Sequence, residues 1–143
     1  MNFDIIKSEN SFDKIKAETS SLCDLLNFLK NNAEYDFDRL NTIIGVDLGA
    51  ETNKFELIYD LYSTKTAKVG RISVVLDRNS PHVPSIVGIY KSAYFDECEL
   101  YDMLGIIFDK NPNLKRLLMP KGWIGYPLRK DYKQEDERLR WGE

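Results

Sequence analysis

Residues 54–62, KFELIYDLY, alternate between strongly apolar and more polar side chains, and this period of two is typical of a β-strand with one buried face. Runs of similar character lie on either side, NTIIGVDL at 41–48 and VGRISVVLD at 69–77. The connections at 49–53 and 63–68 are short enough for hairpins or tight turns. Because consecutive strands with short connections pair antiparallel, we predict an antiparallel sheet with one face covered.

A helix is predicted before these strands, over residues 20–31. Residues 19–21 offer side-chain oxygens for an N-cap, and four apolar residues follow at helical spacing: Leu22, Leu25, Leu26 and Leu29. Nearer the N-terminus, FDIIK at 3–7 could form a further short strand, which the polar run at 8–11 would end. The helix is the expected cover for the buried face of the sheet.

A second helical pattern follows the prolines at 81 and 84. It begins at Ser85 and runs as one or two helices to about Leu104, with Gly105 as a suitable residue to end it. Its first apolar residues are spaced three or four apart: Ile86, Ile89, Tyr90 and Ala93. Together these elements predict an α+β fold, an antiparallel sheet of three or four strands covered by helices.

The sequence changes character after residue 110. NPNLKRLLMPKGWIGYPLRKDY, residues 111–132, has three prolines and two glycines in 22 residues, yet it is rich in large apolar side chains. A segment this irregular and this apolar is expected to lie against a surface of its own domain or of a neighbouring chain. We therefore predict an α+β domain at 1–110 and an extended, irregular partner-docking tail at 111–143.

Charge differs between these parts. Residues 115–143 carry 8 basic and 5 acidic side chains, whereas the whole chain of 143 residues has a formal net charge of −3. An acidic chain without a dense basic patch argues against nucleic-acid binding. No run approaches the ~20 apolar residues that span a bilayer, and the N-terminus lacks the layout of a secretory signal, so a cytoplasmic location is expected.

Few residues suited to catalysis or metal binding stand out. The two cysteines, Cys23 and Cys98, are isolated, which argues against a zinc site or a disulfide framework and leaves a single disulfide open. The one histidine, His82, has no second ligand or nucleophile near it in sequence and is interpreted as a loop residue.

Four carboxylates cluster in the second predicted helix: Asp96, Glu97, Glu99 and Asp102. Such groups can build a metal site or an acid/base pair, but a solvated or partner-facing acidic face is the simpler interpretation. Basic residues of the tail can pair with acids of the same chain or of a neighbour: Lys115, Arg116, Arg129 and Lys130. In a docked tail, apolar side chains would supply most of the affinity and charges would set the register.

Residues 97–132 carry an ordered motif, ECELYDMLGIIFDKNPNLKRLLMPKGWIGYPLRKDY. It resembles the signature of the 30-kDa subunit of respiratory complex I, known in bacteria as the C subunit of the NADH-quinone oxidoreductase. The resemblance lies in three blocks, from Glu97 to Phe108, from Pro112 to Pro120 and from Trp123 to Tyr132. Upstream, GVD at 45–47 and FELIYDLYS at 55–63 are similar to the family's strand pair.

The resemblance implies a non-catalytic subunit that holds no cofactor. It would lie in the peripheral arm, on the cytoplasmic side, of an ion-translocating redox complex, and would meet the membrane only through that complex. Its partners would be a large subunit resembling that of [NiFe] hydrogenases and a small subunit with an iron–sulfur cluster. The implied interface residues are Glu97, Glu99, Tyr101, Asp102, Arg116, Pro120, Trp123, Tyr126, Pro127, Leu128, Arg129, Lys130, Asp131 and Tyr132.

Three interpretations follow for function. The first is a structural subunit that supports electron transfer from a donor such as NADH or ferredoxin, with Glu97, Glu99 and Asp102 holding the helix end and nearby loops by charge-assisted hydrogen bonds. The second is the equivalent subunit of an energy-converting [NiFe] hydrogenase. The third is a stand-alone enzyme that uses the four clustered carboxylates. An adaptor protein unrelated to electron transfer is a remaining alternative to all three.

Overall fold

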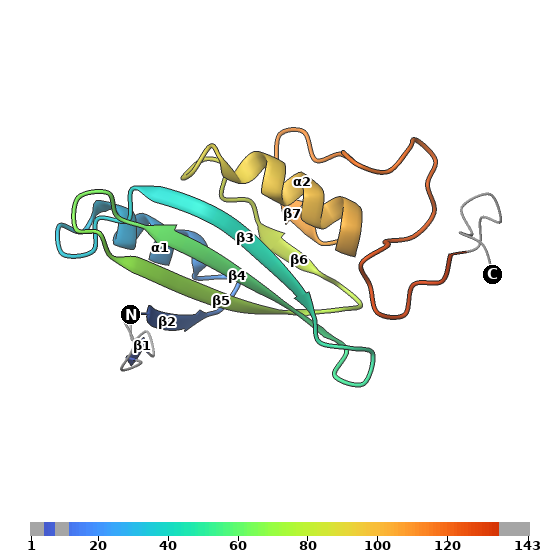
Figure 1. The fold of residues 1–143 in the computed structure, drawn as a ribbon, viewed down its shortest axis with the longest axis horizontal. Coiled ribbons are helices and arrows are strands. Elements are labelled where there is room, and N and C mark those ends of the chain that lie inside the picture. The colour runs from blue at the N-terminus through green and yellow to red at the C-terminus, as the bar shows by residue number, and fades with distance from the viewer. Residues whose placement is uncertain (1–4, 8–11, 135–143) are drawn as a thin grey trace.

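In a computed structural model of the chain, residues 5–7 and 12–134 are described, and they have the predicted α+β architecture (Figure 1). The three central strands are confirmed, and of the predicted strand at 3–7, residues 3 and 4 lie outside the described residues. The elements in chain order are β1 (Ile5–Lys7), β2 (Phe12–Ala17), α1 (Leu22–Asn31), β3 (Arg39–Asp47), β4 (Lys54–Tyr62), β5 (Val69–Asp77), β6 (His82–Pro84), α2 (Ala93–Leu104) and β7 (Ile107–Asp109).

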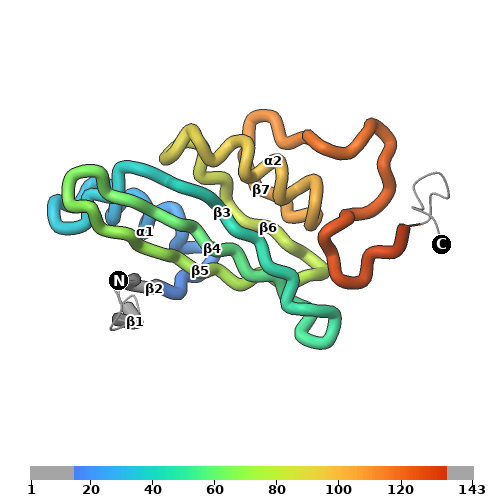
Figure 2. Tube along the Cα trace, viewed as in Figure 1, coloured from blue at the N-terminus to red at the C-terminus, as the bar shows by residue number. Residues whose placement is uncertain are grey.

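Four strands form the main sheet in the order β2-β5-β4-β3 (Figure 2). The three-residue β1 pairs with β2 at the edge of this sheet. The strands β3, β4 and β5 pair antiparallel, as their short connections predict, and Tyr59 stands between Ile43 and Ile72. Strand β2 joins β5 in parallel, so the sheet is mixed and not wholly antiparallel. The sequence pattern misses β2 because FDKIKA has only weak apolar alternation.

One face of the sheet carries the hydrophobic core. The alternate residues of β4 are all 0 % exposed: Phe55, Leu57, Tyr59 and Leu61. Both helices cover this face, α1 through its four leucines and α2 through Leu100 and Leu104. Gly45 of β3 permits the close approach of α2, because a Cβ there would lie 2.6 Å from a methyl carbon of Leu100 and 2.8 Å from one of Leu104.

Helix α1 begins at Leu22, two residues later than predicted, and Ser21, one of the expected N-cap residues, takes the N-cap position without the expected side-chain hydrogen bond. The Ser21 side chain makes no capping bond to the helix, and its Oγ instead donates to the carbonyl of Glu18 at 3.3 Å. The helix therefore depends on burial of its apolar stripe more than on capping. Neither α1 nor α2, the helices of the described region, is long and apolar enough to cross a membrane.

Of the one or two helices predicted from Ser85 to about Leu104, a single one forms, α2, and it starts at Ala93. Residues 86–90 make a single turn, in which the amide of Tyr90 donates to the carbonyl of Ile86 at 2.9 Å. The preceding residues 82–84 form β6, which pairs in parallel with β7, and this small sheet was not predicted. The C-terminal end is as predicted, with Gly105 in the left-handed conformation at φ 76°.

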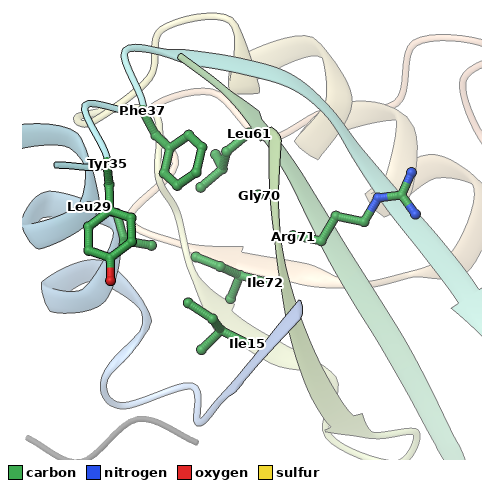
Figure 3. A pocket seen from close by; sticks show the side chains of 8 residues that line it. All are labelled: Ile15, Leu29, Tyr35, Phe37, Leu61, Gly70, Arg71 and Ile72. Atoms are coloured by element: carbon green, nitrogen blue, oxygen red, sulfur yellow. The ribbon is translucent and has the colours of Figure 1, made fainter. Parts of the chain in front are cut away.

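A small apolar cavity lies between the end of α1 and the sheet (Figure 3). Phe37 lies over Gly70, where a Cβ would come within 2.6 Å of the aromatic ring, and Leu61 and Ile72 complete the sheet side. The side chain of Arg71 points away from this apolar group. The cavity has a volume of about 10 Å³, room for about one water molecule, so it belongs to core packing.

Candidate partner-docking site

Residues 111–134, called the C-terminal segment from here on, contain no helix or strand and curve around the C-terminal end of α2 (Figure 1, orange to red). The irregular tail predicted from the prolines and glycines is thus confirmed in its described part. Leu114 packs partly buried against the core near the start of the segment. Three polar anchors hold the remainder to the domain.

The first anchor is Asp102, whose side chain is 0 % exposed in the last turn of α2. Its Oδ2 accepts hydrogen bonds from the amides of Leu117, Leu118 and Met119 at 3.1, 2.7 and 3.0 Å. Its Oδ1 accepts a hydrogen bond from Arg116 at 3.0 Å. A single carboxylate therefore fixes four consecutive residues of the segment.

The same hydrogen bonds keep Asp102 ionised. Burial alone would raise the pKa of this carboxyl group, but the three amides and the Arg116 guanidinium outweigh burial and lower the pKa below its ordinary value of 3.8. A carboxylate with this many donors is well compensated inside the protein. Without it, three amides and a guanidinium would lose their acceptor, which is the costly situation.

The second anchor is the C-terminal end of α2 itself. The amide of Leu128 donates to the carbonyl of Met103 at 3.0 Å, and Nε of Arg129 donates to the carbonyl of Leu104 at 2.7 Å. The last carbonyls of a helix find no donor within the helix and need donors from elsewhere. Here the C-terminal segment supplies those donors.

Tyr126 and Gly105 fit together at this point. A Cβ on Gly105 would lie 2.7 Å from the Tyr126 ring, so glycine is required both for the turn and for the approach of the segment. The guanidinium carbons of Arg116 and Arg129 lie 5.0 and 4.7 Å from the ring centroid of Tyr126, and Tyr101 meets the ring edge-on. Such cation–π contacts combine attraction with a fixed ring orientation.

The third anchor joins the segment to the far end of the sheet. Asp47 ends β3 and forms a buried ion pair with Arg78, which follows β5. Asp47 also accepts from the amide of Lys130 at 2.8 Å, and Arg78 donates to Asp131 at 2.6 Å. Burial opposes ionisation of Asp47, but bonds from Arg78 and the amides of Lys130 and Gly49 lower its pKa.

Sequence reasoning did not assign Asp47 or Arg78 to the site. The available signal for Asp47 was the GVD stretch at 45–47, which resembles the family's strand pair. For Arg78 the sequence offers no pattern, because its partners are 31 and 53 residues away along the chain.

Four large apolar side chains of the C-terminal segment are exposed. Relative exposures are 39 % for Leu117, 62 % for Leu118, 90 % for Ile124 and 62 % for Leu128. Backbone anchors beside three of them fix their positions, since Asp102 holds the amides of Leu117 and Leu118 and Met103 holds that of Leu128. The segment is therefore a preordered apolar surface and not a loosely attached chain.

Glu97 lies inside the domain, at the other end of the carboxylate cluster. It accepts hydrogen bonds from the amide of Ile86 at 2.8 Å and from the side chains of Ser85 and Asn111, both at 2.7 Å. Burial raises its pKa above the ordinary value of 4.5, although these hydrogen bonds act in the opposite direction. Glu97 thus ties the turn before α2 to the start of the C-terminal segment.

The interpretation of the cluster as a solvated or partner-facing face is wrong for Glu97 and Asp102, which satisfy their carboxylates within the chain. Their predicted role in holding the helix end and nearby loops is confirmed. Asp96 is half-buried and accepts from the amide of Ile43 at 3.0 Å, and Glu99 is exposed. Among the described residues no group of three or more side chains is arranged to hold a metal ion.

The other predicted interface residues divide between the two sides of the segment. Those directed mainly to their own chain are Tyr101, Arg116, Tyr126, Arg129 and Asp131. The side chains of Pro120, Leu128 and Lys130 are exposed, and those of Trp123, Pro127 and Tyr132 are half-buried. Contact of these residues with another protein stays a prediction, as does the division of the chain at residue 110.

The remaining chemical candidates do not form a site in the described region. Cys23 and Cys98 are both free thiols, so the disulfide that the sequence left open does not form. His82 begins β6 and does not lie in a loop, and its Nδ1 lies 2.9 Å from Asp109 on the neighbouring strand. Both side chains of that pair are about half exposed.

Comparison with known proteins identifies the family. The model of the family described as "Respiratory-chain NADH dehydrogenase, 30 Kd subunit" matches residues 15–138. The chain belongs to this family. It is 43 % identical over 105 residues to the C 2 subunit of the NADH-quinone oxidoreductase of Rhizobium meliloti, covering 73 % of this chain and 57 % of the relative. It is 39 % identical over 112 residues to the C subunit of the NADH-quinone oxidoreductase of Saccharopolyspora erythraea, covering 78 % and 45 %.

A solved structure has the same fold. A chain of the membrane-bound sulfane sulfur reductase, an archaeal respiratory membrane complex, superposes with a TM-score of 0.74 at 20 % identity. The superposition covers 93 % of this chain and 78 % of the other. The curated relatives are longer, and this chain spans about half the length of several of them.

Proposed function

We propose that this member of the 30-kDa subunit family is a non-catalytic structural subunit in the peripheral arm of a complex I-like redox complex. The observation that carries the proposal is the preordered apolar surface of the C-terminal segment. Exposed Leu and Ile side chains on a backbone fixed by buried ionic anchors are typical of a surface that binds another protein.

The proposed partner is the large subunit that resembles the [NiFe]-hydrogenase large subunit, with the iron–sulfur small subunit nearby. Family membership supports this assignment. The complex would move electrons from a reduced donor such as NADH or ferredoxin to its terminal acceptor, on the cytoplasmic side of a membrane. Iron–sulfur clusters would belong to the partner subunits, and this chain would help to position those subunits and stabilise the complex.

A matched pair of substitutions tests the docking surface. Leu118→Gln together with Ile124→Gln removes two exposed apolar side chains that contribute nothing to the core. Burial of such a side chain contributes about 1.5–3 kcal/mol, so loss of both should weaken assembly by a hundredfold or more, by order of magnitude. The measurement is co-purification of the tagged chain with the co-expressed large and iron–sulfur subunits.

The matched control is Phe28→Gln on α1, which removes an apolar side chain with 51 % exposure away from the segment. We expect it to leave co-purification unchanged. Both variant chains should keep the circular dichroism spectrum and melting temperature of the parent. Normal assembly of the double variant would contradict the proposed docking surface.

A further inference from the structure

Three arginines surround the end of α2 and the far end of the sheet, and they differ in how their charges are balanced. Arg78 is paired with two carboxylates, those of Asp47 and Asp131. Arg116 is paired with the buried carboxylate of Asp102. Arg129 forms no ion pair with any described residue.

Arg129 is nevertheless held rigidly. Its Nε donates to the carbonyl of Leu104 at 2.7 Å, and its guanidinium carbon lies 4.7 Å from the Tyr126 ring centroid and 5.2 Å from that of Phe55. The side chain is half-buried. The terminal nitrogens Nη1 and Nη2 have no hydrogen-bond acceptor among residues 15–134, and the side chain donates only through Nε there.

The electrostatic environment leaves this charge incompletely compensated. Burial and the neighbouring Arg78 lower the pKa of Arg129, and Tyr126 and the carboxylates of Asp131 and Asp47 only partly oppose this. Those two carboxylates are already engaged by Arg78. A part-buried guanidinium is normally hydrogen-bonded to an anion, and its planar fork matches a carboxylate with two parallel bonds.

We infer that the terminal nitrogens of Arg129 bind an aspartate or glutamate carboxylate of the subunit on which the C-terminal segment docks. The inference rests on the proposed function, since it names the chemistry that the docking partner must present. An apolar residue with 62 % exposure, Leu128, adjoins this arginine, so a protein surface that covers Leu128 would also exclude water from the ion pair. That arrangement favours a protein carboxylate over a solvated anion.

Neutralising the arginine tests the inference. Arg129→Gln should weaken binding of the chain to the large and iron–sulfur subunits by roughly thirtyfold or more, because a buried carboxylate of the partner would be left unpaired. The matched control Lys121→Gln removes one exposed charge from the same segment and should change the affinity by less than about threefold.

Arg129 also donates to the carbonyl of Leu104, so its replacement removes a contact within the chain as well. The salt dependence of the binding affinity distinguishes this structural effect from the loss of an intermolecular ion pair. Loss of a positioning residue alone would weaken binding with an unchanged slope of affinity against salt concentration. Loss of an intermolecular ion pair should also flatten that slope. Hydrogen exchange of the isolated chain, measured at the amides of 117–119, 128 and 130, reports whether the segment is still ordered.

A zero-length carbodiimide cross-link can identify the carboxylate. In the assembled complex of Arg129→Lys, the new amine should form an amide bond with one Asp or Glu of the partner, and peptide fragmentation places it at position 129. The parent complex, with arginine there, should give no bond at this position.

Three results would overturn the inference. One is a parent complex that assembles while Arg129→Gln binds with unchanged affinity. Another is a cross-link from position 129 only to Asp131 or Asp47 of the same chain. The third is Arg129-dependent binding of the chain to phosphatidylserine vesicles, with no loss of subunit binding in the glutamine variant. Failure of the parent chain itself to bind the two subunits would count against the proposed function instead.

Discussion

The sheet with its helices and the C-terminal segment are built in opposite ways. In the first region apolar side chains face inward, and Leu25, Leu26 and Tyr59 are 0 % exposed. In the second region the guanidinium groups of Arg116 and Arg129 face the domain, and the side chain most exposed among the large apolar residues is Ile124, at 90 %. The buried carboxylates of Asp102 and Asp47, together with the last carbonyls of α2, hold the second region.

The contrast shows how one chain can keep an apolar surface available for a partner. A segment held by its own hydrophobic contacts would bury the side chains that a partner needs. Hydrogen bonds from buried carboxylates to backbone amides fix the backbone and leave the apolar side chains free. Because the surface is already ordered, a partner would not have to bear the full entropy of ordering it.

The largest effect should come from removing the first anchor. Asp102→Ala leaves the amides of Leu117, Leu118 and Met119 and the guanidinium of Arg116 without their shared acceptor. Breaking such a buried charged cluster typically costs about 3–5 kcal/mol. We expect the C-terminal segment to open while the sheet stays folded, seen as fast hydrogen exchange at 117–119 with strand protection unchanged.

Asp102→Asn is the matched control, since it keeps the shape and one acceptor oxygen and should give a smaller increase in exchange.

Lowering the pH should open the C-terminal segment as Asp102→Ala does. The folded-state pKa values of Asp102 and Asp47 lie below 3.8, so their contribution is fully present above that pH and is lost as the pH falls through the lowered values. Slow exchange at 117–119 in Asp102→Ala would show that other contacts hold the segment.

Shortening a side chain in the core should lower the global stability without opening the C-terminal segment. Leu26 of α1 is 0 % exposed, and Leu26→Ala should lower the free energy of global unfolding by about 2–5 kcal/mol through lost burial and a residual cavity. Local opening of the C-terminal segment should not change, because α1 contributes none of its anchors. Chemical denaturation measures the first quantity and native-state hydrogen exchange the second. A selective loss of protection at 117–119 would disprove this independence.

The sequence predicts the core better than the segment for a physical reason. Alternation at 54–62 and the leucines at 22–29 report burial directly, since the pattern of apolar residues has the period of the element. The periodicity of apolar residues does not reveal the strand at 12–17, because its own alternation is weak and its partner β5 lies more than 50 residues away in the sequence. The turn at 86–90 was predicted as helix because its apolar spacing is helical, yet the Ile86 amide bonds to Glu97.

The sequence identified many residues of the site, but it did not predict how they are arranged in space. The aromatic and basic residues of 123–132 were identified from the resemblance and from the apolar content of the segment. That Glu97 and Asp102 point into the domain could not be predicted, because helical spacing places acids on a face without saying what covers it. The Asp47–Arg78 pair depends on residues far apart in sequence, for which no local pattern exists.

A smaller effect is expected where the two regions meet. Gly105→Ala places a side chain at φ 76°, which costs about 1–2 kcal/mol, and its Cβ would displace the Tyr126 ring. The change should shift the local opening of the segment and only slightly the global stability. Trp123 fluorescence and exchange at Leu128 measure the opening. Gly122→Ala is the control, because it also has a positive φ, of 80°, but its new Cβ would meet no atom within 4 Å beyond its own chain neighbours.

The smallest effect should be a change in the pH dependence at Glu97. Its folded-state pKa is raised, so the protonated form is favoured in the fold and stability is highest below the ordinary value of 4.5. Stability should then decline as the pH rises from 4.5 through the raised value. Glu97→Gln cannot ionise and should remove this decline, while its amide oxygen can still accept from Ile86. Urea denaturation at several pH values between 4 and 8 tests this, and an identical decline in both chains would assign it to another group.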